Sequence, residues 1–146
     1  MRHTPNTSGK NTLNCTPMGP NLYILCGSLF GFAGVLARSL SSHALRPVLE
    51  QRHTLESFNL AADYLVLHGL ALIAATILKH LHPDGRFHWA CLAFTIGTLL
   101  FQGTVLLKSL VSIRPFGFLT PIGGFFLLAG WLLFAWAALC LTSSPR

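Results

Sequence analysis

Six side chains that could do chemistry lie within or beside long apolar stretches of this sequence. They are Arg38, His43, Asp63, Tyr64, His68 and Gln102. An ionisable group inside an apolar span is costly to bury in lipid, so it predicts a functional site by default. Tyr64 and His68 are four residues apart and would share one face of a helix. Arg38 and Asp63 are a base and an acid at comparable depth in successive spans, which predicts an ion pair.

Two histidines of this set suggest further hypotheses. His43 and His68 could relay a proton, or serve as a ligand pair for a haem or a quinone. A histidine near a membrane boundary can instead be satisfied by water or a backbone carbonyl, and we favour that interpretation. A polar path along Asp63, Tyr64, His68 and Gln102 is the alternative that would suit a subunit of a small transporter or channel.

The sequence contains none of the motifs that carry hydrolysis or phosphoryl transfer. It has no nucleophile elbow, no glycine-rich phosphate loop, no H-E-x-x-H and no paired carboxylates. The residues His80, His82, Asp84 and His88 cluster in one short connection. A His-x-His pair on a turn is more typical of a solvated loop than of a zinc site. The leading prediction therefore includes no catalytic residue, no metal and no cofactor, and the protein is not expected to be an enzyme.

The composition indicates a protein that lies in a lipid bilayer. Hydrophobic residues make up 52% of the 146 residues, and charged residues only 10%. Soluble domains carry about 25% charged residues, so this chain could not cover a water-exposed surface. Its net charge of +6 comes from basic residues that sit singly at the ends of apolar runs, with no basic stripe. The predicted partner is therefore the lipid bilayer and not a nucleic acid.

The apolar runs predict an all-α fold, a bundle of four transmembrane helices. The expected spans are residues 22–40, 58–78, 87–107 and 116–141, within a membrane domain of residues 21–142. Residues 1–20 form a polar tail that we expect to be disordered, and residues 143–146 form a second short tail. Basic residues are balanced five against five between the two sides, so the positive-inside rule leaves the orientation open.

The connections carry turn and capping signals. Residues 41–58 form the longest connection, which Pro47 interrupts. Thr54 is expected to cap the second span, because its hydroxyl could accept a hydrogen bond from the first turn. Thr120 is expected to cap the fourth span in the same way, with Pro121 in the first turn.

Glycines at helical spacing predict where the spans pack closely. The candidates are Gly27, Gly31, Gly34, Gly123, Gly124 and Gly130. Gly27 and Gly31 form a G-x-x-x-G pair, and Gly123 and Gly130 are seven residues apart and share a helix face. A glycine lets another backbone approach, so we expect these faces to pack on neighbouring spans of the same bundle in preference to a dimer partner.

Several blocks of the sequence carry a family resemblance. They are Ser42-His43-Ala44-Leu45, residues 58–72 with Asp63, Tyr64 and His68, Phe101-Gln102-Gly103-Thr104, Thr120-Pro121-Ile122-Gly123-Gly124 and Gly130-Trp131. Together they resemble the YgdD-like family of small inner-membrane proteins, a family named for its unknown function. The resemblance covers residues 22–141. It implies a four-span membrane protein and no established activity.

The sequence departs from that family's pattern at two points. Members usually carry Gly-Ala-Phe-Gly-Ala-His before the first connection, whereas this chain has Arg38-Ser39-Leu40-Ser41-Ser42-His43 and lacks both glycines. The Phe-Ser-Gly-Ser of the third span is here Phe101-Gln102-Gly103-Thr104. We predict a multi-pass protein of the bacterial inner membrane with a non-enzymatic structural or interaction role. Its protein partners would be further copies of itself or other membrane proteins.

Overall fold

The computed structural model describes residues 20–83, 86–111 and 117–142, and within these ranges all regular secondary structure is helical. Four long helices are α1 (Pro20–Ser42), α3 (Leu55–Leu81), α4 (Phe87–Leu110) and α5 (Leu119–Thr142), and α2 (Arg46–Gln51) is short. All four long helices are long and apolar enough to cross a membrane. The predicted all-α fold with four membrane spans is therefore confirmed. The predicted tails, apart from Pro20, and Asp84 of the histidine-rich connection lie outside the described residues.

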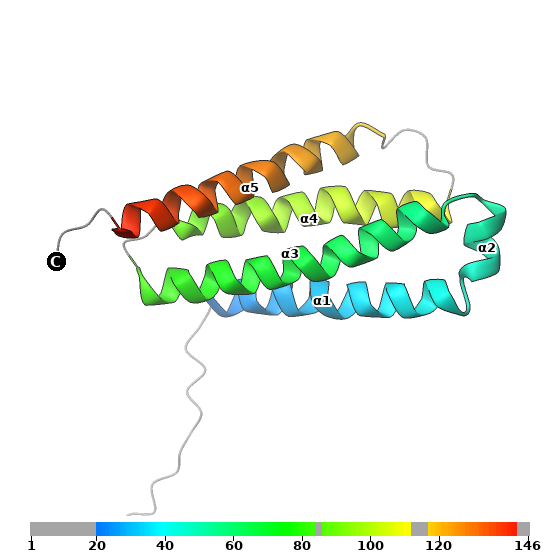
Figure 1. The fold of residues 1–146 in the computed structure, drawn as a ribbon, viewed down its shortest axis with the longest axis horizontal. Helices are drawn as coiled ribbons and strands as arrows, with labels where there is room; N and C mark the ends of the chain where they lie inside the picture. The colour runs from blue at the N-terminus through cyan, green and yellow to red at the C-terminus, as the bar shows by residue number, and fades with distance from the viewer. Residues whose placement is uncertain (1–19, 84–85, 112–116, 143–146) are drawn as a thin grey trace, which may run out of the picture.

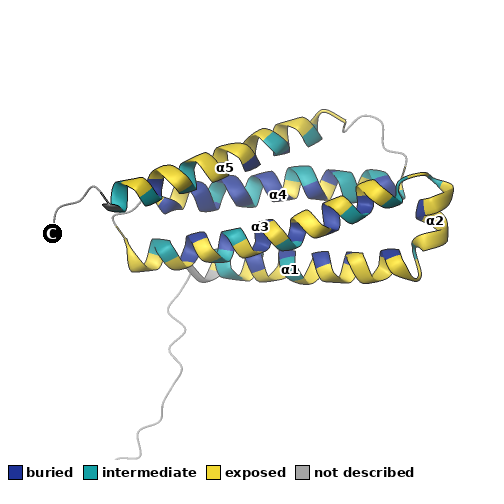
Figure 2. Ribbon diagram, viewed as in Figure 1, coloured by how far each residue is buried: buried dark blue, intermediate teal, exposed yellow. Residues whose placement is uncertain are grey.

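The long helices form an open bundle in which each packs mainly on the next. Helix α1 packs on α3, α3 on α4, and α4 on α5, while α1 makes only a few contacts with α4. Figure 1 shows α1 and α5 at opposite edges of this row. Helix α3 is the most buried span and α5 the least, and Figure 2 shows α5 largely in the colour of exposed residues. The outer helices therefore present most of their apolar surface to lipid.

The lengths of the helices suit a bilayer. Helix α3 has 27 residues, which corresponds to about 40 Å at 1.5 Å per residue. This exceeds the hydrocarbon thickness of about 30 Å, so both ends of α3 reach the headgroup region. It begins at Leu55, three residues before the expected start of the second span. The expected start of the fourth span at Phe116 lies outside the described residues, and α5 begins at Leu119.

Helices α1 and α3 approach each other backbone to backbone. A Cβ added to Gly27 would lie 2.8 Å from the carbonyl oxygen of Gly69, and one added to Gly34 would lie 2.7 Å from that of Ala62. A side chain is excluded at Gly69 for the same reason, because a Cβ there would lie 2.7 Å from the carbonyl oxygen of Gly27. A Cβ on Gly31 would meet nothing within 4 Å. Gly31 therefore takes part in the crossing through its backbone, and a side chain at this position would not clash.

Helices α4 and α5 pack partly through side chains of one helix that lie over glycines of the other, and partly through backbone. A Cβ on Gly130 would lie 2.8 Å from the ring of Phe94, and one on Gly97 would lie 2.8 Å from the Leu127 side chain. A Cβ on Gly123 would collide with the backbone of Leu100 and Phe101. Gly124 is less constrained, since its Cβ would stand 3.5 Å from the Phe101 ring.

The first connection is more regular than expected. Pro47 does not break it but lies in the first turn of α2, where a missing N–H leaves no hydrogen bond unmade. His53 then adopts a left-handed φ of 54°. Its N–H donates to the Glu50 carbonyl, and the Thr54 N–H donates to the Leu49 carbonyl. This pair of bonds is a Schellman motif, which ends α2 and redirects the chain into α3.

Both capping predictions need correction. Thr54 precedes α3 but its side chain does not cap that helix; instead its Oγ1 donates to the Ser109 carbonyl at 3.0 Å. Arg52 Nε donates to the same oxygen at 3.2 Å. Carbonyls in the last turn of a helix lack partners within the helix, so these two bonds satisfy the end of α4. Thr120 is the second residue of α5 and not its cap, and its Oγ1 accepts from Lys108 Nζ at 3.4 Å.

Candidate functional site

The structure divides the six predicted polar residues into two groups that face different neighbours of α3. Arg38, His43 and Asp63 line a hollow of about 560 Å³ at the outer face of α1 and α3. We call this hollow, with Val35, Ser39, Ser42 and Val66 as its other lining residues, the rim site. Tyr64, His68 and Gln102 lie where α3 meets α4 and α5. The change of face follows from the helical turn between adjacent residues 63 and 64.

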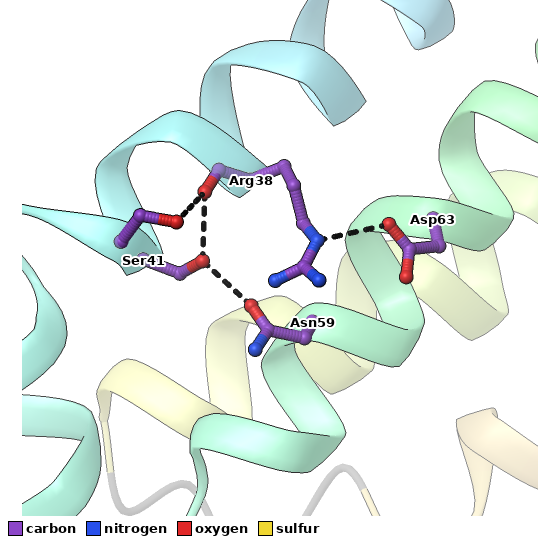
Figure 3. Close-up of polar contacts among 5 residues, drawn as sticks. Arg38, Ser41, Asn59 and Asp63 are labelled. Atoms are coloured by element: carbon purple, nitrogen blue, oxygen red, sulfur yellow. Dashed lines mark hydrogen bonds and ion pairs between the residues drawn. The ribbon is translucent and has the colours of Figure 1, made fainter.

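At the rim site the predicted ion pair is present. Arg38 Nε lies 3.2 Å from Asp63 Oδ1, and the two side chains are 49% and 59% exposed. Figure 3 shows the Arg38 side chain reaching from α1 to Asp63 on α3. Beside this pair Ser41 is almost fully buried, and its single hydroxyl hydrogen is shared between two acceptors, Asn59 Oδ1 at 2.6 Å and the Arg38 carbonyl at 2.8 Å. The contact with Asn59 joins α1 and α3 at the level of the ion pair.

Tyr64 and His68 of the second group line an aromatic groove of about 480 Å³ between α3, α4 and α5, and Gln102 contacts His68 without lining it. Its walls include Tyr64 and His68 from α3, Phe101 from α4 and Trp131 from α5. The Tyr64 and Phe101 rings stack with centroids 6.3 Å apart, and the Trp131 ring stands edge-on to His68 at 6.2 Å. We call this feature the aromatic groove. The groove opens at the surface of the bundle, and in a membrane this surface faces lipid.

His68 is the polar centre of the aromatic groove. It is the middle residue of α3 and only 4% exposed. Its Nδ1 lies 2.9 Å from the Tyr64 carbonyl oxygen and 3.2 Å from Gln102 Nε2. A protonated Nδ1 donates to the carbonyl, whereas a bare Nδ1 accepts from the amide, so each neutral tautomer makes one of the two bonds. In both tautomers Nε2 keeps its own hydrogen-bonding capacity, and none of the described residues bonds to it.

Next to His68, two buried oxygens of α4 have no hydrogen-bond partner among the described residues. They are Gln102 Oε1 and Thr98 Oγ1, and both side chains are fully buried. The two residues are one helical turn apart and so lie on the same face of α4. A buried polar atom without a partner costs free energy, more so inside a bilayer that contains no water. This part of the bundle therefore holds unused hydrogen-bonding capacity close to the middle of the membrane.

The structure does not bring His43 and His68 together. His43 is exposed in the turn after α1 and lines the rim site, whereas His68 is buried and lines the aromatic groove. A ligand pair made of these two histidines is therefore not supported. Asp63 is likewise separated from His68 and Gln102 by its orientation, which interrupts the polar path that the transporter hypothesis needs.

Sequence reasoning missed three residues of these sites. Ser41 joins the rim site through its bond to Asn59, and Phe101 and Trp131 form walls of the aromatic groove. The apolar pattern gave no reason to select them, because large aromatic residues and small hydroxyls occur throughout membrane helices. Only the packing of α5 over α4 brings Trp131 near α3.

Comparisons with known proteins agree with the fold. A family model described as "Protein of unknown function (DUF423)" matches residues 38–124, more than half of the chain. A UPF0382 membrane protein of Staphylococcus haemolyticus is 30% identical over 112 residues, which are 77% of this chain and 90% of that protein. A UPF0382 membrane protein of Schizosaccharomyces pombe is 36% identical over 110 residues, 71% of this chain and 90% of that protein. No solved structure matches.

The predicted resemblance to the YgdD-like proteins is confirmed as well. The UPF0382 inner membrane protein YgdD of Escherichia coli K12 is 25% identical over 116 residues, 80% of this chain and 88% of that protein. The names of these relatives state membrane location and no activity. With four candidate spans of its own, the chain is a multi-pass integral membrane protein. It belongs to the DUF423 family, whose function is unknown.

Proposed function

We propose that the protein is a non-enzymatic membrane protein that binds a lipid-soluble small molecule in its aromatic groove. The observation that carries this proposal is the position of His68. Its imidazole lies at the middle of a membrane span, lines a groove open to lipid and keeps Nε2 without a partner among the described residues. A polar group placed there lowers stability unless something bonds to it, which supports a role in binding.

The shape and chemistry of the groove suit a ligand with a flat ring or a short apolar body and one polar group. Aromatic rings of Tyr64, Phe101 and Trp131 offer large apolar walls with favourable ring-to-ring contacts. His68 Nε2 supplies a single hydrogen bond, as a donor to a carbonyl or as an acceptor from a hydroxyl, according to its tautomer. Access from the side allows such a molecule to enter from the lipid phase without passing through water.

The quinone part of the sequence-based hypothesis is compatible with this groove, whereas a haem held between His43 and His68 is not. One imidazole could hold one ring carbonyl by a hydrogen bond. A transporter role has less support, since the polar residues do not line one continuous path.

The test is to identify what co-purifies with the protein. Full-length protein would be purified from membranes in a mild detergent, and small molecules extracted from it would be identified by mass spectrometry. We expect a lipid-soluble compound near one equivalent per chain. Replacing His68 by Leu should reduce it about tenfold, the loss expected for one hydrogen bond worth about 1.4 kcal/mol.

Thr98→Val is the matched control. It replaces one buried hydroxyl at the same level of the bundle by a methyl group, at nearly constant volume, and Thr98 does not line the groove. The control should keep the compound, and both variants should retain the wild-type circular dichroism. Equal loss in both variants, or no compound in the wild-type protein, would count against the proposal.

A further inference from the structure

The rim site is a second polar feature, separate from the aromatic groove, and its charges face outward. Arg38 and Asp63 are about half exposed on the face of α1 and α3 that no other described helix covers. Within a membrane protein such a face meets lipid. A charged group that faces acyl chains raises the free energy of the folded protein. Charges on this face are therefore tolerated only where headgroups or water can reach them.

The rim site lies a short way inside the headgroup boundary. Arg38 lies four residues before the end of α1 at Ser42, or about 6 Å along the helix. Asp63 lies eight residues after the start of α3 at Leu55, or about 12 Å. Because α3 exceeds the hydrocarbon thickness by about 10 Å, roughly 5 Å at each end lies outside the hydrocarbon, and Asp63 lies about 7 Å inside it. The long Arg38 side chain pairs with Asp63 at this depth and can extend toward the headgroups.

The rim site keeps hydrogen-bonding groups free on both charges. Arg38 uses Nε on Asp63 Oδ1, and no described residue bonds to its two terminal nitrogens. Asp63 Oδ2 is likewise without a partner among the described residues. A guanidinium carries five N–H donors and a carboxylate has two accepting oxygens, so most of the capacity of this pair is unused. Ser39 and His43 add further polar groups to the same hollow.

The rim site is also held rigid. The Ser41–Asn59 hydrogen bond and the close approach of Gly34 to the Ala62 carbonyl join α1 and α3 on either side of Arg38. The hollow between the two helices has a volume of about 560 Å³. Groups that are already in position before a ligand arrives lose little entropy on binding, so this arrangement favours recognition over a loose surface contact.

We infer that the rim site binds the headgroup of a phospholipid that carries both a phosphate and a primary ammonium, as in phosphatidylethanolamine. The guanidinium of Arg38 would hold the phosphate by charge-assisted hydrogen bonds, and Asp63 Oδ2 would accept from the ammonium. A choline headgroup has no N–H to donate and would lose the second contact. An anionic headgroup would place its charge beside the Asp63 carboxylate and would be disfavoured.

Native mass spectrometry of the full-length protein tests this inference. The protein would be released from vesicles that contain equal amounts of phosphatidylethanolamine, its N,N-dimethyl derivative and phosphatidylcholine. We expect the retained lipid to decrease in that order. The first should exceed the last about tenfold, as expected for one hydrogen bond to a charged group. Equal retention of the three lipids, or stronger retention of phosphatidylglycerol in a parallel experiment, would overturn the inference without any variant.

Three variants sharpen the assignment of the two contacts. Asp63→Asn should abolish the preference for the ethanolamine headgroup over choline, and Arg38→Gln should reduce retention of both lipids. Arg46→Gln is the matched control, because Arg46 pairs with Glu50 at 2.8 Å with similar exposure but lies on α2 away from the rim site. If Arg46→Gln reduces retention as much as Arg38→Gln, the lipid binds to surface charge in general and the inference fails.

Discussion

The two outer helices are attached to the bundle by contrasting seams. Helix α1 meets α3 through backbone against backbone, with Gly27 near Gly69 and Gly34 near Ala62. Helix α5 meets α4 in two ways: a Cβ on Gly123 would collide with the Phe101 backbone, whereas farther along the seam the Phe94 ring covers Gly130. A backbone atom cannot move without displacing a whole helix, whereas a ring can rotate or shift. The α1–α3 seam should therefore tolerate far less change than the part of the α4–α5 seam around Gly130.

The contrast extends to polar groups. The α1–α3 seam ends in the hydrogen bond between Ser41 and Asn59 and the ion pair of Arg38 and Asp63. The α4–α5 seam consists mainly of aromatic and aliphatic contacts, with one hydrogen bond from Lys108 to Thr120, and Gln102 of α4 turns toward α3. In lipid, helices associate by close packing and by hydrogen bonds. The α1–α3 seam thus combines close packing with a polar cluster, whereas the α4–α5 seam depends mainly on close packing.

The largest expected effect is at the backbone contact. Gly34→Val should destabilise the protein by about 3 kcal/mol, the upper range for overpacking, because its Cβ would lie 2.7 Å from the Ala62 oxygen. Unfolding by titration with a denaturing detergent, followed by circular dichroism, would measure this. Gly31→Val on the same helix is the control and should change stability by less than about 1 kcal/mol, since nothing lies within 4 Å of its Cβ. Similar losses in the two variants would contradict a seam built on Gly34.

A smaller effect is expected at the aromatic contact of the other seam. Gly130→Ala places a Cβ 2.8 Å from the Phe94 ring. The ring can give way, so the loss should be about 1 kcal/mol, the lower range for overpacking. Gly124→Ala is the control, because its Cβ would make an ordinary contact at 3.5 Å. Alanine favours helix, so the control should be neutral or more stable by up to about 1 kcal/mol. A loss at Gly130 as large as that at Gly34 would remove the proposed contrast.

The smallest of these effects concerns the polar end of the α1–α3 seam. Ser41→Ala removes a buried hydrogen bond to Asn59 and should cost about 1 kcal/mol or slightly less. Ser39→Ala, at an exposed position of the same helix, should leave stability unchanged. Thermal unfolding in detergent would compare the two variants. An unchanged melting temperature for Ser41→Ala would show that the seam is held by its glycines alone.

The sequence predicted the ion pair of Arg38 and Asp63 and the level at which polar groups gather. Both inferences rest on composition, since rare charges within apolar runs must lie near a partner or an interface. It did not reveal that Ser41 takes part where the family pattern has glycine. Ser41 is only 1% exposed and bonds to Asn59, so a hydroxyl supplies a contact where a glycine would supply space. That exchange depends on which residue of α3 lies opposite.

By itself the sequence determined four apolar helices, their membrane location and their approximate extent, because lipid admits few other ways to satisfy the backbone. It could not determine which helices touch, since each span is apolar on most of its circumference and its pattern selects no unique neighbour. Only the tertiary structure placed α5 against α4, set Trp131 beside His68 and turned Asp63 away from Tyr64 toward α1. The six polar residues that looked like one site along the chain are therefore two, because adjacent residues of a helix face different partners.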